Sequence, residues 1–362
     1  MATAKIYCKV GTSKPKSVKS KIKDGTPVQV IQSVDGIRTV IAEGVVHIEG
    51  PPTPPVCQEH AHWDGIVCVC DTGYHDENGV CVPDETPPPP PTGFDKYGIR
   101  MLNPTVGRTW YNRWDNGIAR SWGSKGTDVR NEDPEDPECD LHCKTGERGI
   151  TTTAEVDGNG ICTLTGTTPR LYINDREHAK RWLNVEMTVY FFIVKKLPEG
   201  GAYVACRLAG RSNHQNEYNC SASGTGYSSE VKNSNGTWQE RRENGHPAYS
   251  VNNVSNIKGV EAGRWYGLKH IIQNIENDTA VHIKTLRDLT DGKDGGDWQP
   301  ICEKIDRGDW PLEDKIEYNN INSCSEFKKV AWDKPLLDPT ISCYLRCDNN
   351  QIRFKKFSVR SI

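Results

Sequence analysis

The sequence contains no long apolar run and no excess of charge of one sign. Its longest strongly apolar stretch, residues 189–194, is too short to span a bilayer, so we expect no transmembrane helix. Lys and Arg total 45 against 48 for Asp and Glu, and a net charge of -3 provides no overall basic field for nucleic acid or anionic lipid. The chain also lacks a P-loop, a Gly-x-Gly-x-x-Gly turn after a strand and a Gly-x-Ser-x-Gly elbow. These absences disfavour nucleotide-binding proteins, esterases and general polyanion binders.

Turn-forming and aromatic residues are abundant, whereas methionine is scarce. The chain has 3 Met but 33 Gly, 22 Pro, 10 Trp and 13 Tyr. This mixture favours short strands joined by turns. At about 100–200 residues per domain, 362 residues leave room for two or three folding units. We therefore expect a mainly β protein with more than one domain.

The chain has 14 cysteines, an even and high number that predicts disulfides. The first residues lack the apolar core of a secretory signal. Three explanations stay open: a signal removed before residue 1, a zinc protein kept reduced, or a virion protein oxidised after lysis. The runs Cys139-Asp-Leu-His142-Cys143 and Cys343-x-x-x-Cys347 do not form the paired short spacing of a zinc ribbon. We therefore favour disulfides and predict no metal site.

Residues 1–50 form the first predicted module. They carry seven Lys and one Arg against four acidic residues. Strand-like runs cover 5–10, 28–34 and 37–48, and Asp35-Gly36 between the last two predicts a hairpin. No acid/base constellation is present. We interpret the segment as an anchor or assembly module that contacts other subunits, which predicts a homo-oligomer.

Two proline-rich linkers, residues 51–56 and 83–92, enclose a cysteine-rich segment at 57–82. The segment contains no Lys or Arg, and its pattern is Cys57-x10-Cys68-Val-Cys70-Asp-Thr-Gly-Tyr-x6-Cys81. It resembles the C-terminal half of an epidermal-growth-factor-like module without that family's first two cysteines. The resemblance implies the bridges Cys57–Cys68 and Cys70–Cys81, which would hold a fold too small for a core. A stiff spacer is favoured over a calcium-binding or partner-binding module.

Residues 93–362 form the main predicted domain, with 37 basic and 37 acidic side chains. One short helix is expected at 175–183. A bulge is expected near Lys355 and Lys356, because the apolar alternation changes register there. The expected strands cover 97–102, 155–156, 171–173, 185–194, 202–208, 265–275, 280–289 and 351–361. So many strands with turns rich in Gly, Asn and Asp predict a two-sheet β-sandwich of the jelly-roll type.

Several motifs of the main domain resemble a concanavalin-like jelly-roll family, which we associate with uncharacterised proteins of environmental viruses and archaea and, distantly, with jelly-roll polysaccharide lyases. The resemblance implies that the concave sheet recognises a glycan. The motifs that carry it are residues 95–105, 182–190, 263–269 and 357–362 and the run Arg207-x3-Arg211-x2-His214.

A glycan-binding sheet needs aromatic faces for sugar rings and planar donors for hydroxyl and carboxylate groups. In a lyase of this kind, Arg211 would neutralise a uronate, and His214 with Tyr227, or His246 with Tyr249, would serve as base and acid. The lyases' Arg-x-Glu-x-Arg run and Gln-Ile-His triplet are missing, so we lean away from an enzyme. The alternative is that these are surface loop residues near a Cys206–Cys220 bridge. The candidate glycan-binding residues are Arg207, Arg211, His214, Tyr227, His246 and Tyr249.

We expect no cofactor, with calcium as the alternative. The loop Asp288-x-x-Asp291-Gly-Lys-Asp294-Gly-Gly-Asp297 offers oxygen ligands but lacks the glutamate of a full calcium loop, so a polar turn is favoured. The other cysteines expected in disulfides are Cys206, Cys220, Cys343 and Cys347. The main domain has nine cysteines, so one of them is free, pairs with Cys8 or crosses to another chain.

An anchor module, a stapled spacer and a lectin-like domain predict an adhesin, or a fibre or decoration protein of a virion or cell-surface assembly. Its partner would be a glycan on a cell surface, and its location extracellular or on the virion. Two alternatives stay open: a polysaccharide lyase acting on uronate-containing glycans, and a structural filament subunit.

Overall fold

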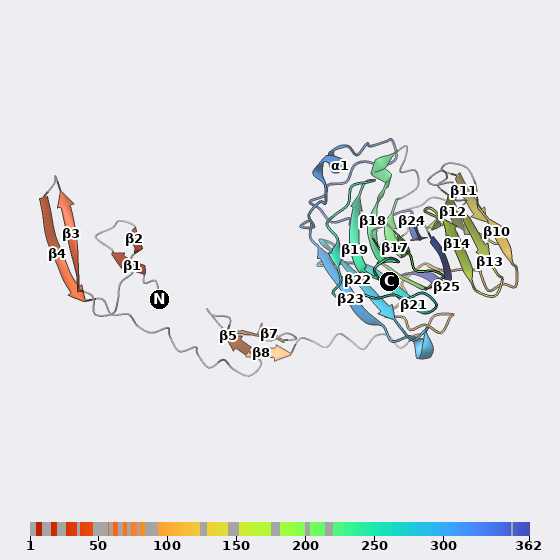
Figure 1. The fold of residues 1–362 in the computed structure, drawn as a ribbon, viewed down its shortest axis with the longest axis horizontal. Coiled ribbons are helices and arrows are strands. Elements are labelled where there is room, and N and C mark those ends of the chain that lie inside the picture. Colours follow the sequence, from red (N-terminus) through yellow and green to blue (C-terminus); the bar gives the residue numbers. More distant parts are fainter. Residues whose placement is uncertain are drawn as a thin grey trace. The chain divides into compact units, whose positions relative to one another are not determined.

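The computed structural model divides the chain into two compact units, Met1–Pro87 and Pro88–Ile362, and the boundary lies within the proline-rich segment 83–92 (Figure 1). In the first unit the structure describes eight short strands and Cys57. From residue 93 onward it describes every residue except 124–128, 144–151, 175–181, 200–202, 214–219 and 349. No helix among the described residues is long and apolar enough to cross a membrane.

The first unit consists of antiparallel strand pairs. The predicted hairpin is confirmed, because Val34 and Ile37 are the last pair in the register of its two strands. Two disulfides, Cys57–Cys68 and Cys70–Cys81, are the pairings that the epidermal-growth-factor resemblance implies. The pairs are β1 (Lys5–Cys8) with β2 (Lys16–Lys19), β3 (Pro27–Val34) with β4 (Ile37–Val45), β5 (Ala61–Trp63) with β6 (Cys68–Cys70), and β7 (Tyr74–Glu77) with β8 (Val80–Pro83).

The second unit is a sandwich of two antiparallel sheets, as the sequence predicts. The nine-stranded sheet has the order β10-β13-β14-β25-β16-β21-β22-β23, with β9 pairing with β25. Its strands are β9 (Thr109–Tyr111), β10 (Arg120–Trp122), β13 (Thr153–Val156), β14 (Cys162–Gly166), β16 (Val185–Ile193), β21 (Trp265–Ile275), β22 (Ala280–Asp288), β23 (Gln299–Asp306) and β25 (Asn350–Ser361).

The eight-stranded sheet has the order β11-β12-β15-β24-β17-β18-β19-β20. Its strands are β11 (Val129–Asp133), β12 (Asp136–Cys143), β15 (Arg170–Asn174), β17 (Val204–Ser212), β18 (Thr225–Lys232), β19 (Trp238–Asn244), β20 (Asn253–Val254) and β24 (Ser342–Arg346). The short helical elements are η1 (Ser221–Ser223), η2 (Lys293–Gly295) and α1 (Lys315–Asn319). The helix expected at 175–183 lies mostly outside the described residues. The strand expected at 97–102 is instead part of a turn closed by one isolated bridge between Phe94 and Arg100.

The core lies between the two sheets and follows from the period-two alternation of the strands. In β16, Val185, Met187, Val189 and Phe191 are fully buried in it. Burial of each such side chain stabilises the fold by about 1.5–3 kcal/mol. Gly210 in β17 faces the same core, where a Cβ atom would lie only 2.6 Å from Ile272. Close packing of the sheets at this point therefore requires glycine.

The disulfide predictions for the main domain are wrong except for the participation of Cys220. Cys206, Cys343 and Cys347 are buried free thiols, and Cys220 pairs with Cys324. Cys206 and Cys343 belong to the core between the sheets, whereas Cys220 precedes η1 in a smaller cluster. Cys343 and Cys347 are four residues apart along extended chain, about 13 Å, which is too far for a bridge.

Candidate functional site

The eight-stranded sheet carries a row of polar side chains on the face turned away from the core. Arg170 of β15, Arg346 of β24 and Arg207 of β17 are directly opposite one another on three neighbouring strands. Their strand neighbours Leu171, Leu345 and Leu208 point into the core, so the arginines point outward. With the residues paired on either side, this arginine row comprises His142, Arg170, Arg346, Arg207, Glu230 and Gln239.

Aromatic rings occupy the next outward-facing position along the same strands. Tyr172 and Tyr344 are opposite each other, with ring centroids 5.5 Å apart. They pack with Ala209 in a cluster separate from the main core. The guanidinium of Arg130 lies 5.0 Å from the centre of the Tyr172 ring. Guanidinium planes and ring faces therefore share one layer on this side of the sheet, in which Arg170, Arg207 and both tyrosines are buried.

The charges of the row are partly balanced by two carboxylates. Glu230 accepts hydrogen bonds from Arg207 Nε at 2.6 Å and from Lys232 Nζ at 2.7 Å. Burial raises the pKa of Glu230, but the charges of Arg207 and Lys232 outweigh burial and leave this pKa well below its usual value. Asp348 forms an ion pair with Arg346.

A second cluster of polar and aromatic side chains lies where β19 ends and the following turn begins. Glu243 pairs through the backbone with Tyr249, and its carboxylate is 3.0 Å from His246 Nδ1. The guanidinium of Arg241 lies 3.8 Å from the centre of the Tyr249 ring. Burial, and after it the charge of Glu243, raises the pKa of Tyr249 well above its usual value despite the nearby charge of Arg207. Tyr249 is therefore a protonated phenol at neutral pH.

Of the residues proposed from sequence, the structure brings Arg207 and Tyr249 within electrostatic range of each other. His246 joins them through Glu243, while His214 lies outside the described residues. Arg211 and Tyr227 do not join this face, because both are fully buried and point to other partners. Tyr227 belongs to the core and donates to Asp306 Oδ2 at 2.6 Å.

Arg211 and Tyr227 hold a long irregular segment, residues 313–341, which we call the strap. Arg211 donates to the carbonyl oxygen of Leu336, and the Tyr227 hydroxyl accepts from the Leu336 backbone N–H. Buried Arg242 donates to the carbonyl oxygens of Ala331 and Trp332. These buried polar side chains thus satisfy backbone groups that have no strand partner.

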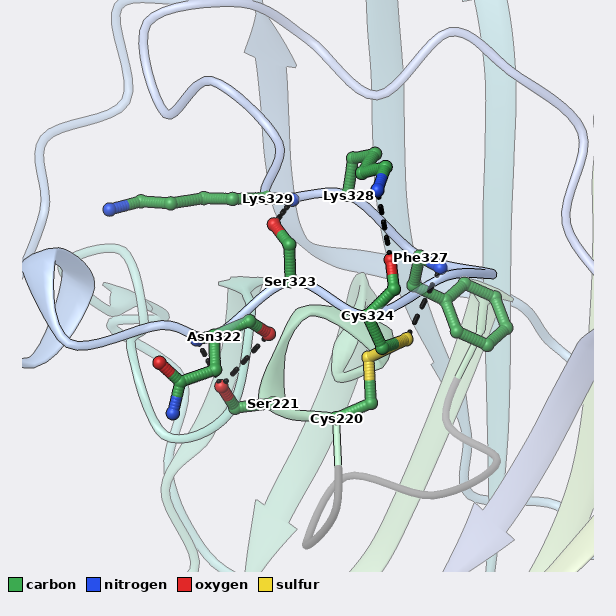
Figure 2. The surroundings of a disulfide bond; sticks show 8 residues. All are labelled: Cys220, Ser221, Asn322, Ser323, Cys324, Phe327, Lys328 and Lys329. Carbon is green, nitrogen blue, oxygen red and sulfur yellow. Dashed lines mark hydrogen bonds between the residues drawn. A yellow bond between two sulfur atoms is a disulfide. The ribbon is translucent and has the colours of Figure 1, made fainter.

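The Cys220–Cys324 disulfide ties the strap to the start of η1 (Figure 2). Beside it, Ser221 Oγ accepts from the backbone N–H of Asn322 at 2.7 Å. Lys328 Nζ donates to the carbonyl oxygen of Cys324 at 3.1 Å. The strap is therefore fixed by covalent and hydrogen bonds near its middle.

Sequence reasoning missed Arg170, Tyr172, Tyr344 and Arg346. The signal was present as Arg170-Leu-Tyr172 and its reverse, Tyr344-Leu-Arg346. Two antiparallel strands with these mirrored triplets place Arg opposite Arg and Tyr opposite Tyr.

In the proposed calcium loop, the first carboxylate is occupied by hydrogen bonds. Asp288 accepts from the backbone N–H groups of Thr290, Gly292 and Asp297 and from the Tyr190 hydroxyl. These donors fix a turn, the structural alternative that the sequence favoured. Among the residues that the structure describes, no cluster of His, Cys, Asp and Glu is arranged to hold a metal ion.

No protein-family model matches the chain, and no curated protein matches it. Solved structures with a similar arrangement include a galectin-like protein of unknown function from Bacillus subtilis, with 12% identity, a TM-score of 0.33, and coverage of 66% of this chain and 98% of that one. The exoplasmic/lumenal domain of VIP36 has 10% identity and a TM-score of 0.38, covering 70% and 92%. Alginate lyase vAL-1 from Chlorella virus has 8% identity and a TM-score of 0.30, covering 60% and 88%.

Proposed function

We propose that residues 93–362 bind an anionic, uronate-containing glycan along the arginine row. The observation that carries this proposal is the placement of Arg170, Arg346 and Arg207 directly opposite one another. Like charges in this position repel one another, although Glu230 pairs with Arg207 and Asp348 pairs with Arg346. A ligand with repeated carboxylates would offset the repulsion through paired guanidinium hydrogen bonds.

The tyrosines support a glycan over other polyanions. Tyr172 and Tyr344 place ring faces in the position next to the arginines. Both rings are buried, so a sugar ring would pack on them only after the covering side chains move aside, with its carboxylate toward the guanidinium groups. A phosphate-rich ligand would use the cations but not the rings.

We further propose that the first unit presents this domain in an extracellular assembly, as an adhesin or fibre protein. Three disulfides are typical of oxidising compartments. The first unit's strand pairs and stapled segment, separated by proline-rich stretches, suit a spacer and an attachment module. Sedimentation of the full chain with and without residues 1–50 tests the attachment role. Loss of self-association on truncation is expected, and unchanged association would contradict it.

The binding test is titration of the full chain with polygalacturonate and with dextran, a neutral polymer. Arg346→Gln should weaken polygalacturonate binding by about tenfold, which is the scale of one charge-assisted contact. Arg353→Gln is the matched control, because Arg353 is an exposed arginine on β25 of the other sheet. Equal binding of dextran, or equal loss in both variants, would refute the proposal.

A lyase is the second candidate, favoured by the Glu243, His246 and Tyr249 group beside Arg207. An arginine would neutralise the uronate carboxylate while His246, oriented by Glu243, removes the proton on the adjacent carbon. A C=C bond forms as the glycosidic C–O bond breaks, and the protonated Tyr249 phenol donates its proton to the leaving oxygen.

Ultraviolet absorbance of the unsaturated product tests this activity. His246→Gln should abolish product formation but leave polygalacturonate binding within about twofold, because His246 would act on the bond rather than hold the polymer. Binding with no product from the unmodified chain would leave the binding proposal standing and exclude the lyase.

A further inference from the structure

A pocket of about 410 Å³ lies between the strap and the ends of β17 and β18. This volume is within the range of small-molecule sites. Arg211 and the Arg207 of the row are four residues apart on β17, about 13 Å along an extended strand. The pocket is therefore separate from the arginine row. Arg211, Asn213, Thr225 and Ala222 line one side, and strap residues 326–331 and 334–340 line the other.

Arg211 brings a buried positive charge to the wall of this pocket. Its side chain is fully buried, and it donates to the carbonyl oxygens of Leu183 and Leu336 and to Asn184 Oδ1. All three acceptors are neutral, and Arg211 forms no ion pair with any carboxylate among the described residues. A buried charge without a counter-ion is costly. Burial lowers the pKa of Arg211 to about 10, which reflects this cost.

The backbone at Arg211 is also unusual. Its φ is 49°, in the left-handed region that residues with a side chain rarely adopt, and the register of β17 with β24 shifts here. By strand alternation Arg211 would face outward with Arg207. The bulge turns it toward the strap instead, at an energetic cost that such sites often bear for a ligand.

Most of the exposed lining residues, which we call the rim, are charged, and most of the buried and half-buried ones are apolar. Lys328, Lys329 and Lys334 join Arg211 against Glu326 and Asp338, four cations against two carboxylates. Asn213 and Thr225 add polar groups. The apolar lining residues are Ala222, Phe327, Val330, Pro335, Leu336, Leu337 and Pro339.

We propose that this pocket binds a small organic acid, with its carboxylate toward the lysine rim above Arg211 and its apolar body against the strap. Arg211 is covered from solvent, so it contributes its charge through the low-dielectric wall rather than a direct contact. Lys334 and Lys328 are exposed and supply the direct contacts. The proposal does not depend on glycan binding by the arginine row.

Calorimetric titration of the full chain with benzoate tests the proposal, with benzyl alcohol as the neutral ligand of the same shape. Benzoate should bind at least about tenfold more tightly than benzyl alcohol, the scale of a charge-assisted contact. The Lys328→Gln/Lys334→Gln double variant should lose most of that difference. Lys258→Gln, at an exposed lysine outside the pocket lining, should behave as the unmodified chain.

Arg211→Gln should weaken benzoate binding further, and a melting curve shows whether this variant folds. If it does not fold, the double variant decides alone, since its lysines are exposed. Equal binding of benzoate and benzyl alcohol, or unchanged affinity in the double variant, would overturn the proposal. So would loss of benzoate binding in Arg346→Gln, which would place the ligand on the arginine row, or equal affinity for inorganic sulfate, which would remove the role of the apolar wall.

Discussion

The outward faces of the two sheets both carry buried cations, but the carboxylates that pair with these cations are arranged differently. On the nine-stranded sheet, Glu186 accepts a hydrogen bond from Lys269 Nζ at 2.7 Å and forms an ion pair with Arg360 at 2.9 Å. The same carboxylate accepts from the backbone N–H groups of Leu102 and Asn103, which belong to the segment covering this face. Cations, carboxylate and covering chain form one closed network.

On the eight-stranded sheet the arginines are paired singly, Arg207 with Glu230 and Arg346 with Asp348, rather than around one shared carboxylate. Three arginines face one another on neighbouring strands, and one glutamate follows them in the row. A carboxylate at the centre holds a fold together, whereas adjacent arginines repel. The comparison is consistent with our proposal that one face serves stability and the other a ligand.

Glu186→Gln should cause the largest change, a loss of stability. This change leaves Lys269 and Arg360 buried without their carboxylate, so we expect a loss of about 3–5 kcal/mol in the free energy of unfolding. Denaturant titration measures it, with Arg346→Gln on the other face as the control. A comparable loss in Arg346→Gln would remove the distinction between the faces.

Low pH should also lower the stability that the Glu186 network contributes. Burial raises the pKa of Glu186, but Lys269 and Arg360 outweigh burial and lower it to about 2. The stability it contributes is therefore present above its ordinary pKa and is lost as the pH falls toward 2. Melting temperatures of the unmodified chain should fall over this interval more than those of Glu186→Gln. An equal fall in melting temperature for both proteins would show that Glu186 does not cause this loss of stability.

High pH should lower the stability that a third region contributes. This region is a series of hydrogen-bonded polar side chains between the sheets. Glu240 accepts from Thr285, Thr285 contacts Ser229, and Ser229 Oγ lies 2.6 Å from His270 Nδ1. Burial raises the pKa of Glu240 to about 8, and Glu303 adds to the shift. Its stabilising contribution is complete below its ordinary pKa and is lost as the pH rises to about 8.

Glu240→Gln should therefore gain stability relative to the unmodified chain by about tenfold in the folding equilibrium constant per pH unit across that interval. Urea titrations at several pH values measure the gain. A difference that stays constant with pH would show that Glu240 does not carry this proton.

Tyr344→Leu, on the face that carries the arginine row, should cause the smallest change, a loss of binding affinity. It removes one ring of the Tyr172–Tyr344 pair but keeps an apolar side chain. We expect about threefold to tenfold weaker polygalacturonate binding, the scale of one aromatic contact. Phe192→Leu on the other sheet is the matched control. Unchanged binding in Tyr344→Leu would exclude the tyrosines from the site.

Local alternation predicted the sandwich and even one of its irregularities. The bulge expected near Lys355 and Lys356 is confirmed, because the register of β25 with β16 shifts there and Lys356 has a φ of 53°. The buried face of β22, with Val281 and Ile283, also follows from period two. These features depend on neighbours in sequence, which the sequence displays directly.

The candidate site was predicted only in part because it depends on strand order. Arg170 and Arg346 are far apart in the chain, and nothing local shows that β15 and β24 pair. Alternation from Arg207 also places Arg211 on the ligand face, but the bulge at its positive φ turns it toward the strap. Tyr227 is opposite Gly210 and points into the core with it.

Thermal unfolding of the unmodified chain and of Arg346→Gln, each with and without polygalacturonate, tests most directly whether the arginine row serves a ligand. We predict that the variant alone melts close to the temperature of the unmodified chain, because the removal of one repelling charge offsets the loss of the ion pair with Asp348. Polygalacturonate should raise the melting temperature of the unmodified chain far more than that of the variant. A variant that melts much earlier, with no effect of the polymer on either protein, would show that the row stabilises the fold and binds no such glycan.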